Sequence, residues 1–430
     1  MKILSFIKIL VLVCLIWIAF SCRLTKNPSN IIAVTKPEEA GFSSVQLARI
    51  DTLLIQDVRK GLTPNAVMYV YRHGKVVYYK AYGWKNIENR EPVQLNSIFR
   101  IASQTKALTS VGLMKLYEKG MFLLDYPISK YIPEFTNPQV LVKINANDSS
   151  YTSRPAKREI TIRHLLSHTS GIPYSNAAFA KARIPMINSL KPITIGEVVK
   201  KIAKLPLDHD PGEGWTYGLS VDVLGYLIEV LSGQPLDEYL IKEIFEPLEM
   251  MDSYFYLPAE KASRLVTLYS NNSINGSLYV CKNVSNQTFP VAGAKTYFSG
   301  GAGVVGTIGD YGNFCQMLLN GGTFHKKQIL KRETIDMMLK NQIGEFHVWN
   351  GKSKFGLGFE LITGESVSSS SGSIGTFGWA GAFATNYLID PVQDMIVLIY
   401  INADPFSNRN KIISEFNKLV YQALLPEKKK

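Results

Sequence analysis

Ser103 and Lys106 stand three residues apart at the start of a stretch that predicts a helix ending at Gly120. Side chains at this spacing lie on one face of a helix, so the hydroxyl and the amine can hydrogen-bond. A serine hydroxyl becomes a nucleophile when a base takes its proton. A lysine amine can be that base only if burial or a nearby positive charge lowers its pKa well below about 10.4. The helix N-terminus would also stabilise a developing oxyanion through its free backbone N–H groups.

The Ser-x-x-Lys spacing alone is a weak signal, because chance also produces it, as at Ser5 and Lys8. The segments around Ser103 strengthen the prediction. A strand-like run precedes this serine, and segments 123–127 and 130–135 follow the predicted helix.

Four further short motifs follow in the sequence, at 160–171, 211–217, 355–359 and 378–381. Together with Ser103 and Lys106, they resemble the serine β-lactamase and penicillin-binding-protein-like superfamily. The resemblance is to its branch of class C β-lactamases, D-aminopeptidases and family VIII esterases. It runs through nearly the whole chain that follows the N-terminal leader, and it implies a serine hydrolase.

This family carries three motifs, and the chain keeps the first, Ser103-x-x-Lys106, intact. The second is usually Tyr-x-Asn and reads Tyr217-Gly218-Leu219 here, while the third, Lys-Thr-Gly or His-x-Gly, reads Trp379-Ala380-Gly381. The resemblance therefore implies that Ser103 is the nucleophile and that Lys106 and Tyr217 activate it. It also implies an oxyanion hole formed by the backbone N–H groups of Ser103 and Ala382. No metal or cofactor is expected.

The two altered motifs predict a substrate pocket that includes Leu219, Trp379 and Gly381. In the family, the lost asparagine recognises an amide and the lost lysine recognises a carboxylate, and a β-lactam presents both groups. Apolar side chains at these positions favour a neutral ester instead. The predicted function is therefore carboxylic ester hydrolysis through an acyl-enzyme on Ser103, with a small-molecule ester or acyl substrate.

Two alternatives remain open for the same chain. The first is a β-lactamase, a D-alanyl-D-alanine carboxypeptidase or a D-aminopeptidase that uses the same nucleophile. The second is a non-catalytic binding protein of the cell envelope on the same fold. A nucleic-acid partner is not expected, because the net charge of +12 comes from scattered lysines and arginines without a zinc-finger, RNP or helix-turn-helix pattern.

The elements that must position these residues are clearest at the two ends of the chain. Segments 67–71 with 75–82, and 384–389 with 395–400, predict two β-hairpins. Helices are expected at 43–60 and 411–425, where apolar residues recur with helical spacing. The fold class predicted is α+β and β-lactamase/transpeptidase-like, with one domain at 43–425. Its antiparallel sheet comes from about 43–103 and 295–425, flanked by helices, and a mainly helical subdomain spans about 104–294.

The N-terminus predicts export. Lys2 and Lys8 flank an apolar run that ends at Ser21-Cys22, as in a bacterial lipobox, so 1–21 is the expected signal peptide and Cys22 the lipidated residue. Phe20 departs from the small residue usual in a lipobox. A plain signal peptide and a membrane span are the alternatives, and the run is short of the roughly 20 residues a span needs. Residues 22–42 are the expected tether, which places the protein in the bacterial cell envelope, membrane-anchored and periplasmic or surface-facing.

Three other patterns are interpreted as structural. His164 and His168 have the spacing of metal ligands, but Leu165 stands where a zinc protease has glutamate, so packed, hydrogen-bonded histidines are predicted. The glycine pattern at 301–306 predicts a tight loop at the rim of the active site, before a helix starting near 307–310, and no dinucleotide site. For Cys281 and Cys315, a disulfide stays open, although a small buried thiol is favoured for Cys315.

Overall fold

The computed structural model describes residues 32–145, 150–272, 276–369 and 371–426. The expected signal peptide at 1–21 and the lipidation site Cys22 lie outside these residues and stay predictions. Among the described helices, none combines the length and the apolar character needed to cross a membrane. The end of the expected tether differs from the prediction. Pro37–Ala40 forms a short 3-10 helix, and Phe42 is fully buried, because its ring packs into the core beside the last helix.

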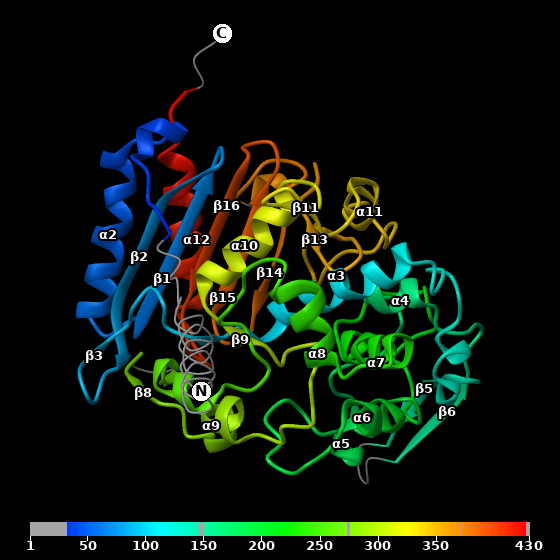
Figure 1. The fold of residues 1–430 in the computed structure, drawn as a ribbon. Coiled ribbons are helices and arrows are strands. Elements are labelled where there is room, and N and C mark those ends of the chain that lie inside the picture. Colours follow the sequence, from blue (N-terminus) through cyan, green and yellow to red (C-terminus); the bar gives the residue numbers. More distant parts are fainter. Residues whose placement is uncertain (1–31, 146–149, 273–275, 370, 427–430) are drawn as a thin grey trace, which may run out of the picture. The chain divides into compact units, whose positions relative to one another are not determined.

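One large antiparallel sheet of eight strands organises the fold (Figure 1). It confirms both predicted hairpins, and the two hairpins lie side by side because Val70 pairs with Val397. The sheet therefore joins the first and last parts of the chain, as expected. In spatial order its strands are β12 (Lys354–Phe355), β13 (Glu360–Leu361), β14 (Phe377–Gly381), β15 (Thr385–Asp390), β16 (Met395–Tyr400), β1 (Asn65–Arg72), β2 (Lys75–Asn86) and β3 (Glu91–Pro92).

Helices cover both faces of this sheet (Figure 1). Helices α2 (Ser44–Arg59) and α12 (Arg409–Gln422) contact each other on one face, which confirms the two predicted terminal helices. Helix α10 (Ile308–Leu319) packs on the other face against β16, β1 and β15. Successive side chains of a strand point to opposite faces, so both faces of the central strands must be apolar to be buried. The fully buried sequence of β16, Met395–Tyr400, meets that requirement.

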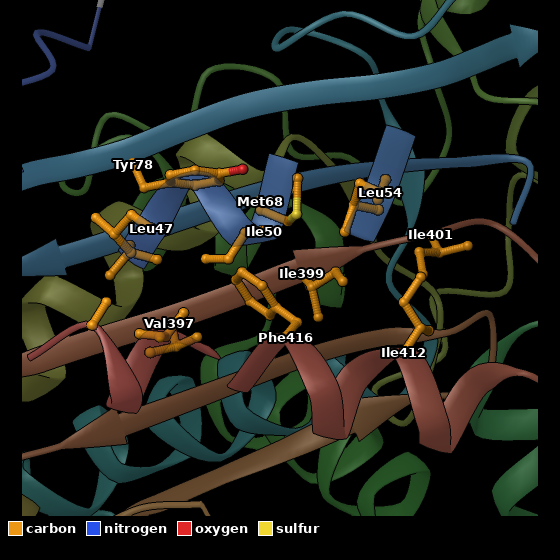
Figure 2. Close-up of a cluster of buried hydrophobic side chains, with 14 of the residues drawn as sticks. Leu47, Ile50, Leu54, Met68, Tyr78, Val397, Ile399, Ile401, Ile412 and Phe416 are labelled. Atoms are coloured by element: carbon orange, nitrogen blue, oxygen red, sulfur yellow. The ribbon is translucent and has the colours of Figure 1, made fainter. Parts of the chain in front are cut away.

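The core between the sheet and helices α2 and α12 is shown in Figure 2. Leu54 of α2 and Phe416 of α12 are fully buried there, together with Met68 and Ile399 of the central strands. Ser43 caps the N-terminus of α2 by accepting a hydrogen bond from the backbone N–H of Gln46. This core fixes the sheet, and the sheet carries one wall of the cavity described below.

The middle of the chain is mainly helical, as predicted, with α3 and α7 packed together at its centre. Its helices are α3 (Thr105–Glu118), α4 (Ile162–Leu166), α5 (Ala177–Ala182), α6 (Ile195–Ile202), α7 (Ser220–Ser232), α8 (Leu236–Leu240) and α9 (Val284–Ala292). Two hairpins that the sequence did not indicate also lie in this region: β5 (Gln139–Ile144) with β6 (Tyr151–Pro155), and β7 (Tyr269–Asn271) with β8 (Leu278–Val280). Strand β6 is exposed along its whole length, so it lacks the alternating apolar pattern that marks a half-buried strand.

Shorter elements complete the description. Strand β4 (Phe99–Arg100) pairs with β9 (Val305–Gly306), and β10 (Thr323–Phe324) pairs with β11 (Lys327–Gln328). Helix α11 (Arg332–Met338) precedes β12. The β4–β9 pair matters most for the site, because it leads the chain into Ser103.

The core between α2 and the sheet yields a stability prediction. Leu54→Ala removes a fully buried side chain, so the free energy of unfolding should fall by about 2–5 kcal/mol through lost burial and a residual cavity. Leu123→Ala makes the same change at a side chain that is 52% exposed, and its effect should stay below about 1 kcal/mol. Urea unfolding of both variants measures the difference, and equal losses would contradict the assigned core.

Candidate active site

Ser103 lies in a 3-10 turn, Ala102–Gln104, that directly precedes α3. The sequence placed it at the start of the helix itself, and the structure puts it one short turn earlier. The turn requires a left-handed backbone at Ala102, whose φ is 45°. Ser103 is 8% exposed and lines a cavity, so its hydroxyl is accessible from one side only.

Arg100 anchors the strand that leads into this turn, and its role was not predicted. Its guanidinium is fully buried and donates hydrogen bonds to the backbone oxygen of Val266 at 2.7 Å and to Oδ1 of Asn402 at 3.0 Å. A third bond, to the backbone oxygen of Asn286, is 2.9 Å long. A charged residue inside the apolar segment 98–101 was the available signal, because a buried charge needs such partners.

Lys106 projects from the first turn of α3 toward Ser103. Its Nζ atom lies 3.3 Å from Oγ of Ser103, which confirms that the two side chains are close enough to hydrogen-bond. The amine also donates to the hydroxyl of Tyr174 and to the backbone oxygen of Gly301, each at 2.7 Å. The three bonds use all three N–H donors of an ammonium group.

The pKa of Lys106 decides whether its amine can take the proton of Ser103. Burial alone would lower the pKa of Lys106. The hydroxyls of Tyr174 and Tyr217 and the carboxyl of Asp222 outweigh burial and raise that pKa above its ordinary value. The three hydrogen bonds that Nζ donates fit an ammonium group.

Asp222 on α7 is a second residue that the sequence analysis missed. It is fully buried, and its Oδ1 accepts from Oγ of Ser299 at 2.6 Å and from the hydroxyl of Tyr297 at 3.3 Å. The backbone N–H of Gly301 donates to the same carboxyl, so the Gly301 residue lies between Asp222 and Lys106. Burial raises the pKa of Asp222. An acidic residue between the apolar residues Val221 and Val223, in the first turn of a largely apolar helix, was the available signal.

Tyr217 and Trp379, both predicted as site residues, meet directly. Nε1 of Trp379 donates a hydrogen bond of 3.0 Å to the hydroxyl of Tyr217. Nζ of Lys106 lies 4.8 Å from the centre of the Tyr217 ring. Trp379 was predicted only as an apolar surface, but its indole N–H supplies a polar contact to the tyrosine.

Aromatic rings surround Tyr217 on several sides. Trp349 is 62% exposed, and its backbone is left-handed with a φ of 53°. Its ring contacts the rings of Trp215 and Tyr217. Side-chain packing holds such a conformation, which costs free energy for a residue other than glycine. The rings whose centres lie within 6.1 Å of Tyr217 belong to His168, Tyr174, Trp215, Trp349 and Trp379.

A cavity of about 510 Å³ opens beside these residues. Ser103, Tyr217, Trp379 and Ala382 all line it, so the structure brings the predicted nucleophile, tyrosine, pocket residue and oxyanion-hole residue together. Two predicted pocket residues, Leu219 and Gly381, are not among the residues that line it. Leu219 differs most from the prediction. It is 1% exposed at the N-terminus of α7 and faces the protein interior, so it does not form the pocket surface expected of it.

Gly381 allows β14 to approach the turn that carries Ser103. A Cβ atom at this position would lie 2.2 Å from the backbone oxygen of Ile101, far closer than real side chains come. The backbone oxygen of Gly381 accepts a hydrogen bond of 2.9 Å from Nη2 of Arg409. Arg409, on α12, also lines the cavity, and burial lowers its pKa. The cavity therefore contains a cation, contrary to the expectation of an apolar pocket.

Comparison with known proteins agrees with this geometry. The sequence profile of the family described as Beta-lactamase matches residues 50–420. The chain belongs to the beta-lactamase family. Esterase EstB of Burkholderia gladioli is 27% identical over 372 residues, which cover 83% of this chain and 90% of the esterase. Lovastatin esterase of Penicillium rubens is 31% identical over 278 residues, covering 63% of this chain and 67% of that protein.

The fold of this beta-lactamase family member is also shared with solved structures. EstCE1, described as a hydrolase with promiscuous acyltransferase activity, superposes with a TM-score of 0.75. The match covers 88% of this chain and 99% of that one at 24% identity. It confirms the predicted β-lactamase/transpeptidase-like fold.

In this family member the two candidate metal ligands are structural. Nδ1 of His164 accepts from the backbone N–H of Thr161 at 3.2 Å, and burial lowers the pKa of His164 to about 4. His168 is packed as predicted, but neither ring nitrogen has a hydrogen-bond partner among the described residues, so the expected hydrogen bond is absent there. No group of three potential metal ligands occurs in the described parts of the chain.

The cysteines and the glycine-rich loop also have structural roles. Cys281 and Cys315 are both free and buried, and burial raises the pKa of the Cys315 thiol. The loop at 301–306 leads into α10. Thr307 caps the N-terminus of this helix, because its side-chain oxygen accepts a hydrogen bond of 3.1 Å from the backbone N–H of Asp310. This agrees with the predicted loop at the rim of the site.

Burial of His168 makes stability depend on pH. Burial keeps the pKa of His168 well below its ordinary value, so the folded protein holds it neutral, whereas the unfolded chain takes up a proton near pH 6.5. The free energy of unfolding therefore decreases as the pH falls below about 6.5. His168→Gln should reduce the loss between pH 7 and pH 5 by roughly 2 kcal/mol, measured by urea unfolding at both pH values.

His325→Gln is the control, because the side chain of His325 is 63% exposed. This variant should keep the pH dependence of the wild-type protein. An unchanged dependence in His168→Gln would show that His168 is protonated without unfolding.

Proposed function

We propose that this protein is a serine hydrolase that cleaves carboxylic esters through an acyl-enzyme on Ser103. The observation that carries the proposal is the contact between Oγ of Ser103 and Nζ of Lys106, 3.3 Å long, at the wall of the cavity. Membership of the beta-lactamase family supports a serine nucleophile at this position.

Tyr217 is the proposed base. In this proposal Lys106 stays an ammonium group, which its three donated hydrogen bonds favour, so it stabilises negative charge nearby and does not itself take the serine proton. In the phenolate form, Tyr217 would accept a charge-assisted hydrogen bond from Trp379 and lie beside the Lys106 cation. The phenolate takes the proton of Ser103 as Oγ attacks the ester carbonyl, and then gives that proton to the departing alkoxide. A water molecule deprotonated by the same group releases the acid and restores Ser103.

The oxyanion that forms during attack needs donors in place beforehand. The backbone N–H groups of Ser103 and Ala382 are proposed for this role, because both residues line the cavity. The close approach of β14 at Gly381 brings the two backbones near each other.

The preference for esters rests on Trp379. An indole stands where the β-lactam-directed members of the family have a lysine, so the position lacks the cation that would bind a substrate carboxylate. The relatives named as esterases agree with this assignment.

Arg409 favours one alternative, a carboxypeptidase acting on a D-alanyl-D-alanine terminus. Its guanidinium in the cavity could pair with a terminal carboxylate. Faster cleavage of a D-alanyl-D-alanine peptide than of a short-chain 4-nitrophenyl ester would assign this alternative.

The nucleophile is tested by Ser103→Ala. This change removes the only atom that can carry the acyl group in the proposed mechanism, so turnover of a short-chain 4-nitrophenyl ester should be lost while the fold is kept. A fluorophosphonate probe should label the wild-type protein and not the variant. Ser129→Ala is the control and should retain labelling, because Ser129 is hydrogen-bonded to Glu159 and does not line the cavity. Labelling that persists in Ser103→Ala would refute the assignment.

The hydrogen bond from Trp379 to Tyr217 is tested by a matched pair of substitutions. Trp379→Phe removes the hydrogen-bond donor that stabilises the phenolate form of Tyr217 in the proposed mechanism, which should lower kcat by about 10- to 150-fold, or about 1.5–3 kcal/mol. Trp215→Phe changes another tryptophan that stacks on Tyr217, with ring centres 6.1 Å apart, but that does not donate to its hydroxyl. Steady-state kinetics should show a clearly smaller effect for Trp215→Phe, and equal effects would argue against a role for the indole N–H.

A further inference from the structure

The cavity beside Ser103 continues to the opposite face of β14. Side chains alternate along this strand, so Trp379 faces Tyr217 while Ala380 faces the side of helix α12. Ala380 pairs with Asn386 of β15, and both line the same cavity as Ser103. On its other edge, β14 pairs with β13 at Phe377 and Gly378, and this pairing does not extend to residues 379–381. The cavity can therefore pass around the edge of β14 beyond Gly378.

Two amide oxygens in the α12 side of the cavity lack partners. Asn417 of α12 is 7% exposed, and its Oδ1 atom is buried with no hydrogen-bond partner among the described residues. Oδ1 of Asn386 is in the same situation. Burial of an unsatisfied acceptor costs about 1–3 kcal/mol, so proteins seldom retain two of them in one cavity without a function. Both residues line the cavity, and rotation of each amide about its terminal torsion exchanges the oxygen with the NH2 group, so each can offer a ligand an acceptor or a donor.

The remaining polar groups define which ligand fits. Arg409 uses Nη2 for Gly381, and its guanidinium has further N–H donors that a ligand oxygen can accept from. Glu360 lines the cavity as well, accepts a hydrogen bond from Ser353, and has its pKa raised by burial. The presence of both a cation and a carboxyl does not select for an anion. Donors and acceptors in alternation suit a neutral group with several hydroxyls, each of which donates and accepts.

We propose that the part of the cavity formed by Asn386, Asn417 and Arg409 binds the hydroxyl groups of a sugar, so that the enzyme removes a small acyl group from a carbohydrate. This inference rests on the proposed ester hydrolysis. The exposed indole of Trp349, which also lines the cavity, offers a flat apolar surface for the C–H face of the sugar ring. A cavity of about 510 Å³ accommodates a monosaccharide with a short acyl chain.

In the proposed reaction, each bond that forms or breaks and each proton transfer is accounted for. Oγ of Ser103 forms a bond to the acyl carbon, and the bond from that carbon to the sugar oxygen breaks. The sugar oxygen receives the proton that Tyr217 took from Ser103. Water then cleaves the acyl-enzyme, which releases the carboxylic acid and returns the proton to Ser103.

The test compares two acetate esters that differ in their hydroxyls and in one ring oxygen. Glucose acetylated at its 6-hydroxyl and cyclohexylmethyl acetate share the acyl group, the primary alcohol and a six-membered ring. The wild-type enzyme should cleave the sugar ester with at least a tenfold higher kcat/KM. Equal cleavage, or a preference for the cyclohexyl ester, would overturn the sugar site. A preference for a D-alanyl-D-alanine peptide over both would also overturn it.

Substitutions then locate the site. Asn417→Leu should lower the ratio of the two kcat/KM values by at least tenfold, because the amide no longer meets the sugar hydroxyls. Lys418→Leu changes the next residue of α12, which is exposed, and should leave the ratio unchanged. If Asn417→Leu does not fold, Asn386→Val provides the same comparison from β15. The ratio of the two kcat/KM values in the wild-type enzyme tests the sugar site without any variant. A ratio that no variant lowers would contradict the assigned residues.

Cleavage of 4-nitrophenyl acetate separates the two proposals. If the wild-type protein cleaves none of the three esters (the sugar acetate, cyclohexylmethyl acetate and 4-nitrophenyl acetate), ester hydrolysis itself is refuted. Hydrolysis of the nitrophenyl ester without a preference for the sugar ester would refute only the carbohydrate site.

Discussion

The buried ammonium group of Lys106 is the interaction on which the site depends. A charge removed from water must be compensated by close polar partners. Its partners come from three separate parts of the chain: Ser103 in the turn before α3, Tyr174 after α4, and Gly301 in the loop before α10. One cation therefore holds the nucleophile turn, the helical region and the glycine-rich loop in a single arrangement. Asp222 completes it through the backbone of Gly301.

The sheet supplies the other wall of the site. Strand β14 is held by β15, which pairs with β16, and β16 pairs with β1 from the start of the chain. This continuity places Trp379 beside Tyr217 and places Ala382 beside Ser103 in the cavity. The same strand separates the cavity into an aromatic side and a polar side.

Much of the fold and part of the site were predictable because their signals are local. Alternating and helical patterns of apolar residues marked the two hairpins and the helices at both ends of the domain. The spacing of Ser103 and Lys106 was sufficient to bring them together, because residues three apart meet across a 3-10 turn that continues into a helix, as they do within a helix. Membership of the family followed from the order of short motifs. The hairpins at 139–155 and 269–280 were missed because their strands are short or exposed on both faces.

By itself, then, the amino-acid sequence determined the antiparallel sheet with its terminal helices, the family, and the identity of Ser103, Lys106 and Tyr217 as candidates. Only the tertiary structure decided which groups surround them. Tyr174 at Lys106 and Arg409 in the cavity depend on contacts between residues far apart in the chain. Leu219 turned inward and Trp379 became a hydrogen-bond donor for the same reason. A residue type states what a side chain can do, but its burial and partners depend on how distant elements pack.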